Sequence, residues 1–431
     1  MKICVYGLWH LGSVTAACLA EAGLPTAGLD PGADAIAKLS KGEPPLFEPG
    51  LAELVSSGIE KGVLSFTTDA VVAVRGASVI WVAFDTPVDD EDRADVEYVK
   101  QKIIEIFPYL RDGTVVLVSS QMPVGSIASL EKAFAPVAEG RMVTFACSPE
   151  NLRLGKAIEI FKNPGRIIIG VRDEWARLVL EPMLSRFCEQ LIWISVESAE
   201  MTKHTLNAFL ATSVTFINEI ATICENVGAN AVEVERAIRS DPRIGTKMYV
   251  TPGPAFAGGT LARDVTFLNR LASETGYDAP LLGGILPSNG AHRLWTLRRL
   301  KQLVSPLLGA RIAVLGLSYK PGTDAVRRSV AIELCRGLVF EGAQVRAYDP
   351  VVKALPPDLA GAVQLCGTAL EAVDGAVALV VATEWPDFRA LVPGELVKHM
   401  ARALVIDQAR LLVQTIGATA GVEYVTFGQP T

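Results

Sequence analysis

The sequence contains few of the residues that mark disulfide-bonded or metal-binding proteins. Its 431 residues include only seven cysteines and four histidines. The cysteines are scattered and form no CxxC pair, which argues against a disulfide framework or a structural zinc site and fits a reducing cytoplasm. With so few histidines and no HExxH motif, a His-based metal site is not expected either. We therefore expect a cytoplasmic protein without a bound metal.

Long apolar runs and basic clusters are missing as well. No apolar run reaches the roughly 20 residues of a membrane helix. The formal net charge is −7, without a run of Lys or Arg, whereas proteins that bind nucleic acid or anionic membranes usually carry a basic face. The sequence thus indicates neither a nucleic-acid nor a membrane partner. Any anionic ligand must be bound by a local site.

Short apolar strands alternate with helical stretches at both ends of the chain. We expect strands at 2–6, 25–30, 78–84, 114–120, 142–146, 166–171, 311–315, 344–349, 377–382 and 403–407. Such alternation predicts βαβ units with parallel sheets, hence an α/β fold with one α/β unit toward each end of the chain. Between them, residues 196–228 have the spacing of one long connecting helix, and more helix follows to about residue 300.

A glycine turn follows the first expected strand. It reads GLWHLG (7–12), precedes a small-residue helix, and is followed 18 residues later by Asp30. In a dinucleotide-binding turn, glycines permit the bend and the close approach of the pyrophosphate, while an acid accepts from the ribose 2′-OH and so favours NAD. Here Trp9 replaces the second glycine. The simpler alternative is a tight βα turn without a ligand.

A second glycine turn (316–322) follows the strand expected at 311–315. By itself it indicates only a tight loop. Lys320 within it would ordinarily be a solvated lysine, and Asp349 is more often a strand-end residue than a second cofactor ligand.

Seven short motifs occur in order along the chain. They are EPGL (48–51), SPENL (148–152), KxxxN (203–207), RIG (243–245), FAGGTLARD (256–264), YKPGT (319–323) and TEW (383–385). Together they resemble the UDP-glucose/GDP-mannose dehydrogenase family over almost the whole chain, far more specifically than any single motif. The resemblance implies an NAD-binding Rossmann domain (1–195), a helical domain that forms the homodimer (196–305) and a Rossmann-like domain that binds the nucleotide sugar (306–431).

The resemblance also implies a chemistry. Enzymes of that family oxidise a primary C6 alcohol to a carboxylate in two NAD-dependent steps, through a thioester on a catalytic cysteine. By position, Lys203 and Asn207 correspond to the groups that stabilise the oxyanion. Asp264 corresponds to the residue that orients water or acts as base, and Glu150 to the one that assists hydrolysis.

Further positions correspond to ligand contacts of the family. Those implied for NAD are Gly7, Trp9, His10, Leu11, Gly12, Asp30, Thr86, Gln121, Arg263 and Arg327. Those implied for the nucleotide sugar, with a UDP-hexose favoured, are Leu152, Arg243, Phe256, Gly258, Lys320 and Arg410. Any of the charged ones, taken alone, would ordinarily be a surface salt-bridge residue.

Several positions depart from the family pattern. Where the family has FGGSCFxKD, this chain has FAGGTLARD, so Thr260 stands at the position of the catalytic cysteine. No cysteine lies between residues 225 and 334 to replace it. A threonine hydroxyl without an evident base is a very poor nucleophile beside a thiolate. Gln121 for a water-binding threonine and Leu154 for a glutamate are further changes.

Three hypotheses follow. The first is an NAD-dependent nucleotide-sugar dehydrogenase that performs a single two-electron oxidation, because the thiol nucleophile is absent. The second is a full UDP-glucose 6-dehydrogenase that makes the uronate without a cysteine, with Asp264 or Glu150 activating water. The third is a non-catalytic protein that binds nucleotide sugars, since Trp9 is a bulky residue at the pyrophosphate contact.

Overall fold

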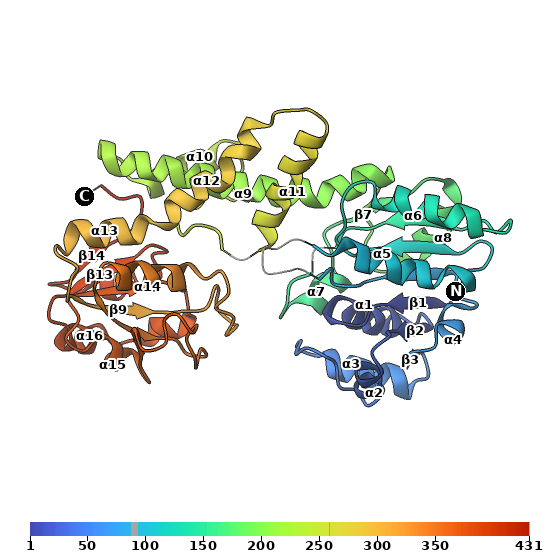
Figure 1. Cartoon of the computed structure of the whole chain (residues 1–431), viewed down its shortest axis with the longest axis horizontal. Coiled ribbons are helices and arrows are strands. Elements are labelled where there is room, and N and C mark those ends of the chain that lie inside the picture. The colour runs from blue at the N-terminus through green and yellow to red at the C-terminus, as the bar shows by residue number, and fades with distance from the viewer. Residues whose placement is uncertain (88–93, 151, 258, 431) are drawn as a thin grey trace. The chain divides into compact units, whose positions relative to one another are not determined.

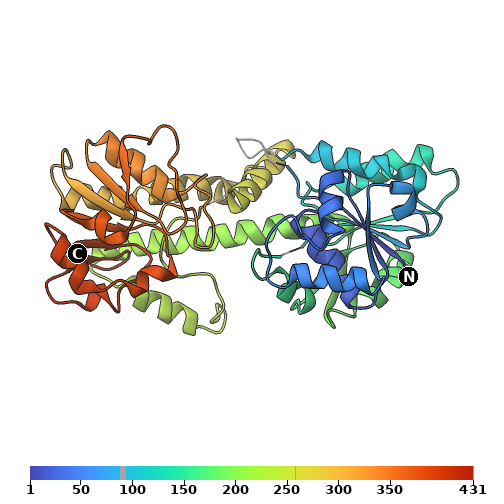
Figure 2. The same cartoon turned by 90° about the horizontal axis from the view of Figure 1, so that it is seen from below.

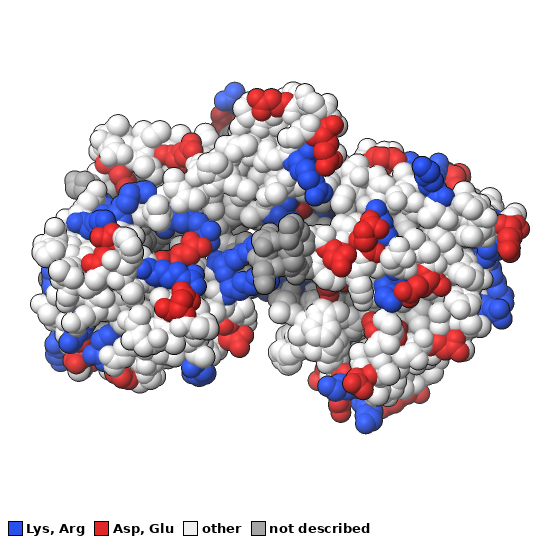
Figure 3. All heavy atoms as spheres, viewed as in Figure 1, with Lys and Arg blue, Asp and Glu red and all other residues white. Residues whose placement is uncertain are grey.

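The structure, a computed structural model, describes the chain except for residues 88–93, 151, 258 and 431. The chain divides into two compact units, Met1–Thr205 and Leu206–Thr431, which are described separately below. On the face of each unit seen in Figure 3, acidic and basic side chains lie interspersed.

The first unit is built on an eight-stranded sheet in the order β3-β2-β1-β4-β5-β6-β7-β8. All neighbouring strands are parallel except β6 and β7, which pair antiparallel. The strands are β1 Ile3–Tyr6, β2 Thr26–Leu29, β3 Leu64–Thr67, β4 Val79–Val82, β5 Val115–Val118, β6 Thr144–Cys147, β7 Ile167–Gly170 and β8 Leu191–Ile194.

Helices cover both faces of this sheet (Figure 1). They are α1 His10–Glu21, α2 Ala33–Leu39, α3 Leu51–Glu60, α4 Ala70–Val74, α5 Val96–Glu105, α6 Ser126–Phe134, α7 Ala157–Lys162 and α8 Glu174–Leu184. Successive side chains of a strand point to opposite faces, so Ile3 and Val5 join one hydrophobic core while Cys4 and Tyr6 join the other. A sheet buried on both faces explains why β1, β4 and β5 are continuous apolar runs.

Helix α9, Val196–Val227, is the long helix expected from the sequence, and the boundary between the two units lies within it (Figure 2). By length and composition alone it is one helix that could cross a membrane, with a mean hydropathy of 1.3 over its most apolar window. The central helix of a globular protein has the same properties, and 44% of that window is buried.

The second unit contains the rest of α9 and a six-stranded parallel sheet in the order β11-β10-β9-β12-β13-β14. Its strands are β9 Arg311–Leu315, β10 Gln344–Tyr348, β11 Val363–Leu365, β12 Ala378–Val381, β13 Leu404–Asp407 and β14 Glu423–Val425. Its helices are α10 Ala231–Ser240, α11 Thr260–Glu274, α12 Pro280–Arg293, α13 Trp295–Leu303, α14 Val330–Phe340, α15 Ala369–Val373 and α16 Pro393–His399.

This sheet also has a core on each face, since Ile312 and Val314 belong to one and Ala313 and Leu315 to the other. The predicted fold class, two Rossmann-like parallel sheets and a helical region between them, is confirmed. The domain boundaries 1–195, 196–305 and 306–431 stay a prediction.

Candidate functional site

The first glycine turn forms a tight cradle between β1 and α1. Gly7 has φ +92°, and a Cβ there would lie 2.9 Å from the backbone nitrogen of Phe84. A Cβ on Gly12 would lie 1.7 Å from the Gly7 carbonyl oxygen. Both positions therefore require glycine. The amides of the first turn of a helix have no acceptor within it, so the start of α1 can receive phosphate oxygens.

Asp30 holds this turn in place. One carboxylate oxygen accepts from the Leu8 amide and the other from the Gly32 amide, each at 2.8 Å. The aspartate thus stands beside the turn, as a ribose-binding acid must. The side chain of Trp9 is 51% exposed, whereas that of Leu11 is buried. The bulky residue at the second glycine position therefore points out of the core.

The carboxyl ends of β4 and β5 carry two further residues implied for NAD. The Thr86 hydroxyl donates to the carbonyl oxygen of Gln121 at 2.7 Å. In this sheet the strand order reverses between the parallel neighbours β1 and β4, because β2 and β3 extend the sheet on one side of β1 and β4 begins the other side. Ligands of doubly wound sheets bind outside the strand ends at such a switch point. The glycine turn, Thr86 and Gln121 all follow strands that meet there.

A small pocket brings Gln121, Glu150 and Lys203 together within the first unit. Its volume of about 20 Å³ is sufficient for roughly one water molecule. The Lys203 ammonium donates to the Glu150 backbone carbonyl at 2.5 Å. The Glu150 carboxylate accepts from the Leu152 amide, so lysine, glutamate and the stretch that carries Leu152 form one connected group.

In the second unit, Asn207 and Asp264 form a pair. The Asn207 amide donates to a carboxylate oxygen of Asp264 at 2.5 Å, and the aspartate is completely buried. Thr260, by contrast, is the exposed first residue of α11. The backbone of Phe256 is held by Asn289, which donates to its carbonyl and accepts from its amide. Gly258 lies outside the described residues.

The cationic side chains of this unit have different environments. Arg243 is 88% exposed and pairs with Asp241 at 2.7 Å. Lys320 is exposed, with its ammonium 5.5 Å from the ring centre of Tyr319. Arg263 is partly buried on α11, and Arg327 is exposed before α14.

Arg410 is the most constrained of these cations. It has φ +61°, a left-handed backbone that is uncommon for arginine, and its guanidinium donates to the Phe427 carbonyl. Burial lowers the pKa of Arg410 from its ordinary value, although an arginine remains charged at any physiological pH.

Asp349 is the acidic residue at the end of a strand in the second unit, and its carboxylate is hydrogen-bonded within the protein. It is 2% exposed and accepts from four backbone amides, two of which belong to Leu317 and Ser318 in the second glycine turn. Burial raises its pKa, but these hydrogen bonds outweigh burial and hold the pKa below the usual range. Asp349 is therefore buried, whereas Asp30 is partly exposed.

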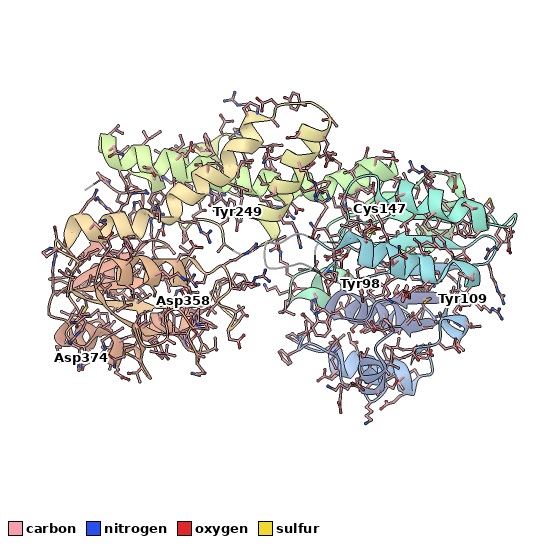
Figure 4. All side chains as sticks on the ribbon, viewed as in Figure 1. Tyr98, Tyr109, Cys147, Tyr249, Asp358 and Asp374 are labelled. Atoms are coloured by element: carbon pink, nitrogen blue, oxygen red, sulfur yellow. The ribbon has the colours of Figure 1, made fainter. Side chains whose placement is uncertain are left out.

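None of the seven cysteines, all within the described residues, is an exposed thiol. Cys147, at the carboxyl end of β6 and labelled in Figure 4, lines the pocket with Lys203. Burial, reinforced by the nearby Glu200, raises the pKa of this thiol far above its ordinary value. Among the described residues there is also no group of three His, Cys, Asp or Glu side chains that could hold a metal ion.

Two buried glutamates near these groups were given no role in the sequence analysis. Glu48 bonds to His10 and to two amides at the start of α7. Glu200, one turn before Lys203 on α9, accepts from the amides of Gly125 and Ile127 at the start of α6. The EPGL motif contains Glu48, but the two backbone amides that bond to Glu48 lie more than a hundred residues further along the chain.

Comparison with known proteins shows which family this chain resembles. Residues 1–188 match the NAD binding domain of the UDP-glucose/GDP-mannose dehydrogenase family, residues 197–291 its central domain and residues 313–414 its UDP binding domain. The chain is 36% identical to a UDP-glucose 6-dehydrogenase of Rhizobium meliloti (strain 1021), with both chains covered completely.

Solved structures agree with this match. A UDP-glucose dehydrogenase from Pyrobaculum islandicum superimposes with a TM-score of 0.82 at 29% identity, over 94% of this chain and 93% of that one. A UDP-D-ManNAc dehydrogenase from Pyrococcus horikoshii gives 0.84 at 25% identity, over 100% and 99%. The chain therefore belongs to the UDP-glucose/GDP-mannose dehydrogenase family, whose members are NAD-dependent oxidoreductases that act on the CH–OH groups of nucleotide sugars.

Proposed function

We propose that this protein is a UDP-hexose dehydrogenase that removes one hydride per substrate molecule and releases an aldehyde or ketone. The observation that carries the proposal is the absence of an accessible thiol. Thr260 stands at the family's cysteine position, and every cysteine of the chain is buried. Without a thiolate there is no covalent intermediate through which the second oxidation of the family proceeds.

The first unit has the features that NAD requires. A cradle too tight for any Cβ at Gly12, the start of α1 and the carboxylate of Asp30 match the pyrophosphate and ribose in position and chemistry. Thr86 and Gln121 lie at the neighbouring strand ends, where the nicotinamide half is expected. When bound, NAD supplies the hydride acceptor, and the protein supplies orientation and charge.

Oxidation of an alcohol releases a hydride and a proton. We assign removal of the proton, and stabilisation of the oxygen that loses it, to residues of this chain. Lys203 and Asn207 are four residues apart on α9, which places both on one face of the helix. We assign both as donors to the reacting oxygen, where they stabilise alkoxide character. The proton leaves through water to Asp264, the carboxylate partner of Asn207.

Cys147 does not replace the missing thiol in this proposal. It lines the pocket that contains Lys203, but burial raises its pKa, so that little thiolate forms at neutral pH. Thr260 is exposed at the first position of α11. Its hydroxyl would need an adjacent base to become a nucleophile, and we assign it no covalent step.

From the family pattern we assign binding of the nucleotide sugar to six residues, Leu152, Arg243, Phe256, Gly258, Lys320 and Arg410. The three cationic side chains among them are the groups that can pair with the diphosphate. A diphosphate carries two negative charges, and cationic donors are its usual partners. The match to the family's UDP binding domain supports this assignment.

We also propose a homodimer. On the part of α9 in the second unit, three large apolar side chains recur every seven residues, Phe209, Phe216 and Ile223, and each is more than half exposed. A seven-residue apolar repeat on a helix is typical of a surface that packs against another helix. Phe216→Asp should convert the protein to a monomer in sedimentation velocity; an unchanged sedimentation coefficient would contradict the proposal.

A second function is favoured by one observation, the 36% identity to a UDP-glucose 6-dehydrogenase over both full chains. In that alternative the aldehyde hydrate is oxidised directly, with Glu150 or Asp264 activating water. The discriminating experiment incubates the protein with NAD and a panel of UDP-, GDP- and dTDP-sugars and identifies the products by mass spectrometry. We expect a loss of two mass units; a gain of fourteen, the uronate, would favour the alternative.

A further inference from the structure

We propose that Glu48 is a positioning residue that couples binding of NAD to binding of the nucleotide sugar. This inference rests on the proposed function, because it concerns the same two ligands. Glu48 lies in a loop before α3, and its side chain is 1% exposed. A glutamate is almost never buried so completely unless its carboxylate is bound on all sides.

Its hydrogen bonds join two segments that are far apart in the sequence. One carboxylate oxygen accepts from the Ala157 amide at 2.8 Å. The other accepts from the Gly155 amide at 2.7 Å and lies 3.0 Å from Nε2 of His10. Burial raises the pKa of Glu48, but these three partners outweigh burial and keep the pKa below its ordinary value.

The first segment is the start of α1, the helix that receives the pyrophosphate in the proposed function. His10 is its first residue and follows directly on the glycine turn, and its side chain is 14% exposed. A hydrogen bond to a buried carboxylate therefore fixes the orientation of the imidazole and resists movement of the first turn of α1.

The second segment consists of residues 152–157, which follow Glu150 and lead into α7. Gly155 has φ +86°, which turns the chain into α7. The two segments also touch the same apolar pocket of about 110 Å³, which is lined by Leu11 of α1 and by Leu152. Glu48 is thus the polar connection between two elements that already pack together.

Such a connection makes binding cooperative. A ligand that fixes the start of α1 also fixes α7 through Glu48, so the second ligand no longer has to order that segment. Coupling of this kind is reciprocal and usually amounts to about 5–150-fold in affinity. It is absent if the two segments move independently.

The test measures NADH affinity by fluorescence titration, with and without saturating UDP-glucose. In the unsubstituted protein we expect UDP-glucose to tighten NADH binding at least about fivefold. Glu48→Gln keeps the shape of the side chain but leaves one backbone amide without an acceptor, and His10→Phe removes only the connection to α1. Both should reduce the coupling to less than about twofold.

A matched control separates coupling from stability. Asp69 also accepts from two amides at a helix start, those of Val71 and Val72 at α4, a helix that packs mainly against β2 and β3. Asp69→Asn should keep the full coupling. In His10→Phe, the Gly155 and Ala157 amides should both stay protected from hydrogen exchange, whereas in Glu48→Gln one of the two should lose that protection.

The outcomes are distinguishable. Equal coupling in all four proteins, or no coupling in the unsubstituted one, would overturn the inference alone. If NADH or UDP-glucose did not bind at all, the proposed function would fail and this inference with it. Loss of coupling in Glu48→Gln and His10→Phe, with Asp69→Asn unaffected, supports a positioning role.

Discussion

The pair formed by Asn207 and Asp264 permits a quantitative prediction. Asn207→Ala removes the hydrogen bond that the amide donates to a completely buried carboxylate. Hydrogen bonds to charged groups contribute about 1.5–3 kcal/mol to stability. In a unit of this size, a loss of about 2 kcal/mol lowers the unfolding temperature by roughly 4–8 °C. Because Asn207 is also assigned to the reacting oxygen, kcat should fall about 10²–10³-fold.

The assay combines differential scanning calorimetry with NADH production from the nucleotide sugar. Asn226→Ala is the matched control, because Asn226 lies on the same helix, is exposed and bonds only within the helix, to the Thr222 carbonyl. It should change stability by less than about 0.5 kcal/mol and leave kcat unchanged. The reasoning fails if Asn207→Ala behaves like this control in both measurements.

Four further predictions concern the ligand-binding groups. Trp9→Gly should tighten NADH binding in fluorescence titrations, because the backbone of the turn becomes accessible to the pyrophosphate; weaker binding would mean that the indole contributes a contact. Gly12→Ala should abolish NADH binding, since its Cβ would fall 1.7 Å from the Gly7 carbonyl oxygen; retained affinity would place NAD elsewhere. Arg410→Lys should raise KM for the nucleotide sugar about tenfold with little change in kcat, and an unaltered KM in steady-state kinetics would remove Arg410 from the site. Because the folded-state pKa of Glu48 is lowered, its ionised carboxylate stabilises the fold at pH values above the unfolded-state pKa, and this stabilisation is lost as the pH falls through the folded-state pKa; as the pH is lowered below about 5, the melting temperature should therefore fall less in Glu48→Gln than in the unsubstituted protein.

Much of the fold could be predicted because its elements have strong local signals. The strand, glycine turn and helix at residues 2–22 and the uninterrupted apolar spacing of 196–228 correspond closely to β1, α1 and α9. The strands at the sheet edges had no such signal. β3 and β8 have four residues each and are only partly buried, so they lack the continuous apolar run of a central strand.

The candidate site was less accessible to sequence reasoning. A motif in the sequence shows which residue types recur, and it identified Lys203, Asn207 and Asp264 as a set. It does not show which carboxylate joins which backbone amides. Glu48 and Glu200 reach partners more than seventy residues away, and only the folded sheet brings them together. Both glutamates accept hydrogen bonds from backbone amides at the start of a helix, and no spacing of residues in the sequence predicts that role.

The central claim, that the missing thiol limits the enzyme to one oxidation, is tested most directly by stoichiometry. A limiting amount of the nucleotide sugar is consumed completely with a large excess of NAD, and the NADH formed is measured by absorbance. A carbonyl reagent is added only after NADH formation has stopped, so that it cannot remove an aldehyde before a second oxidation. The account predicts one NADH per sugar and a product that reacts with the carbonyl reagent. Two NADH per sugar, with a carboxylate product, would contradict it.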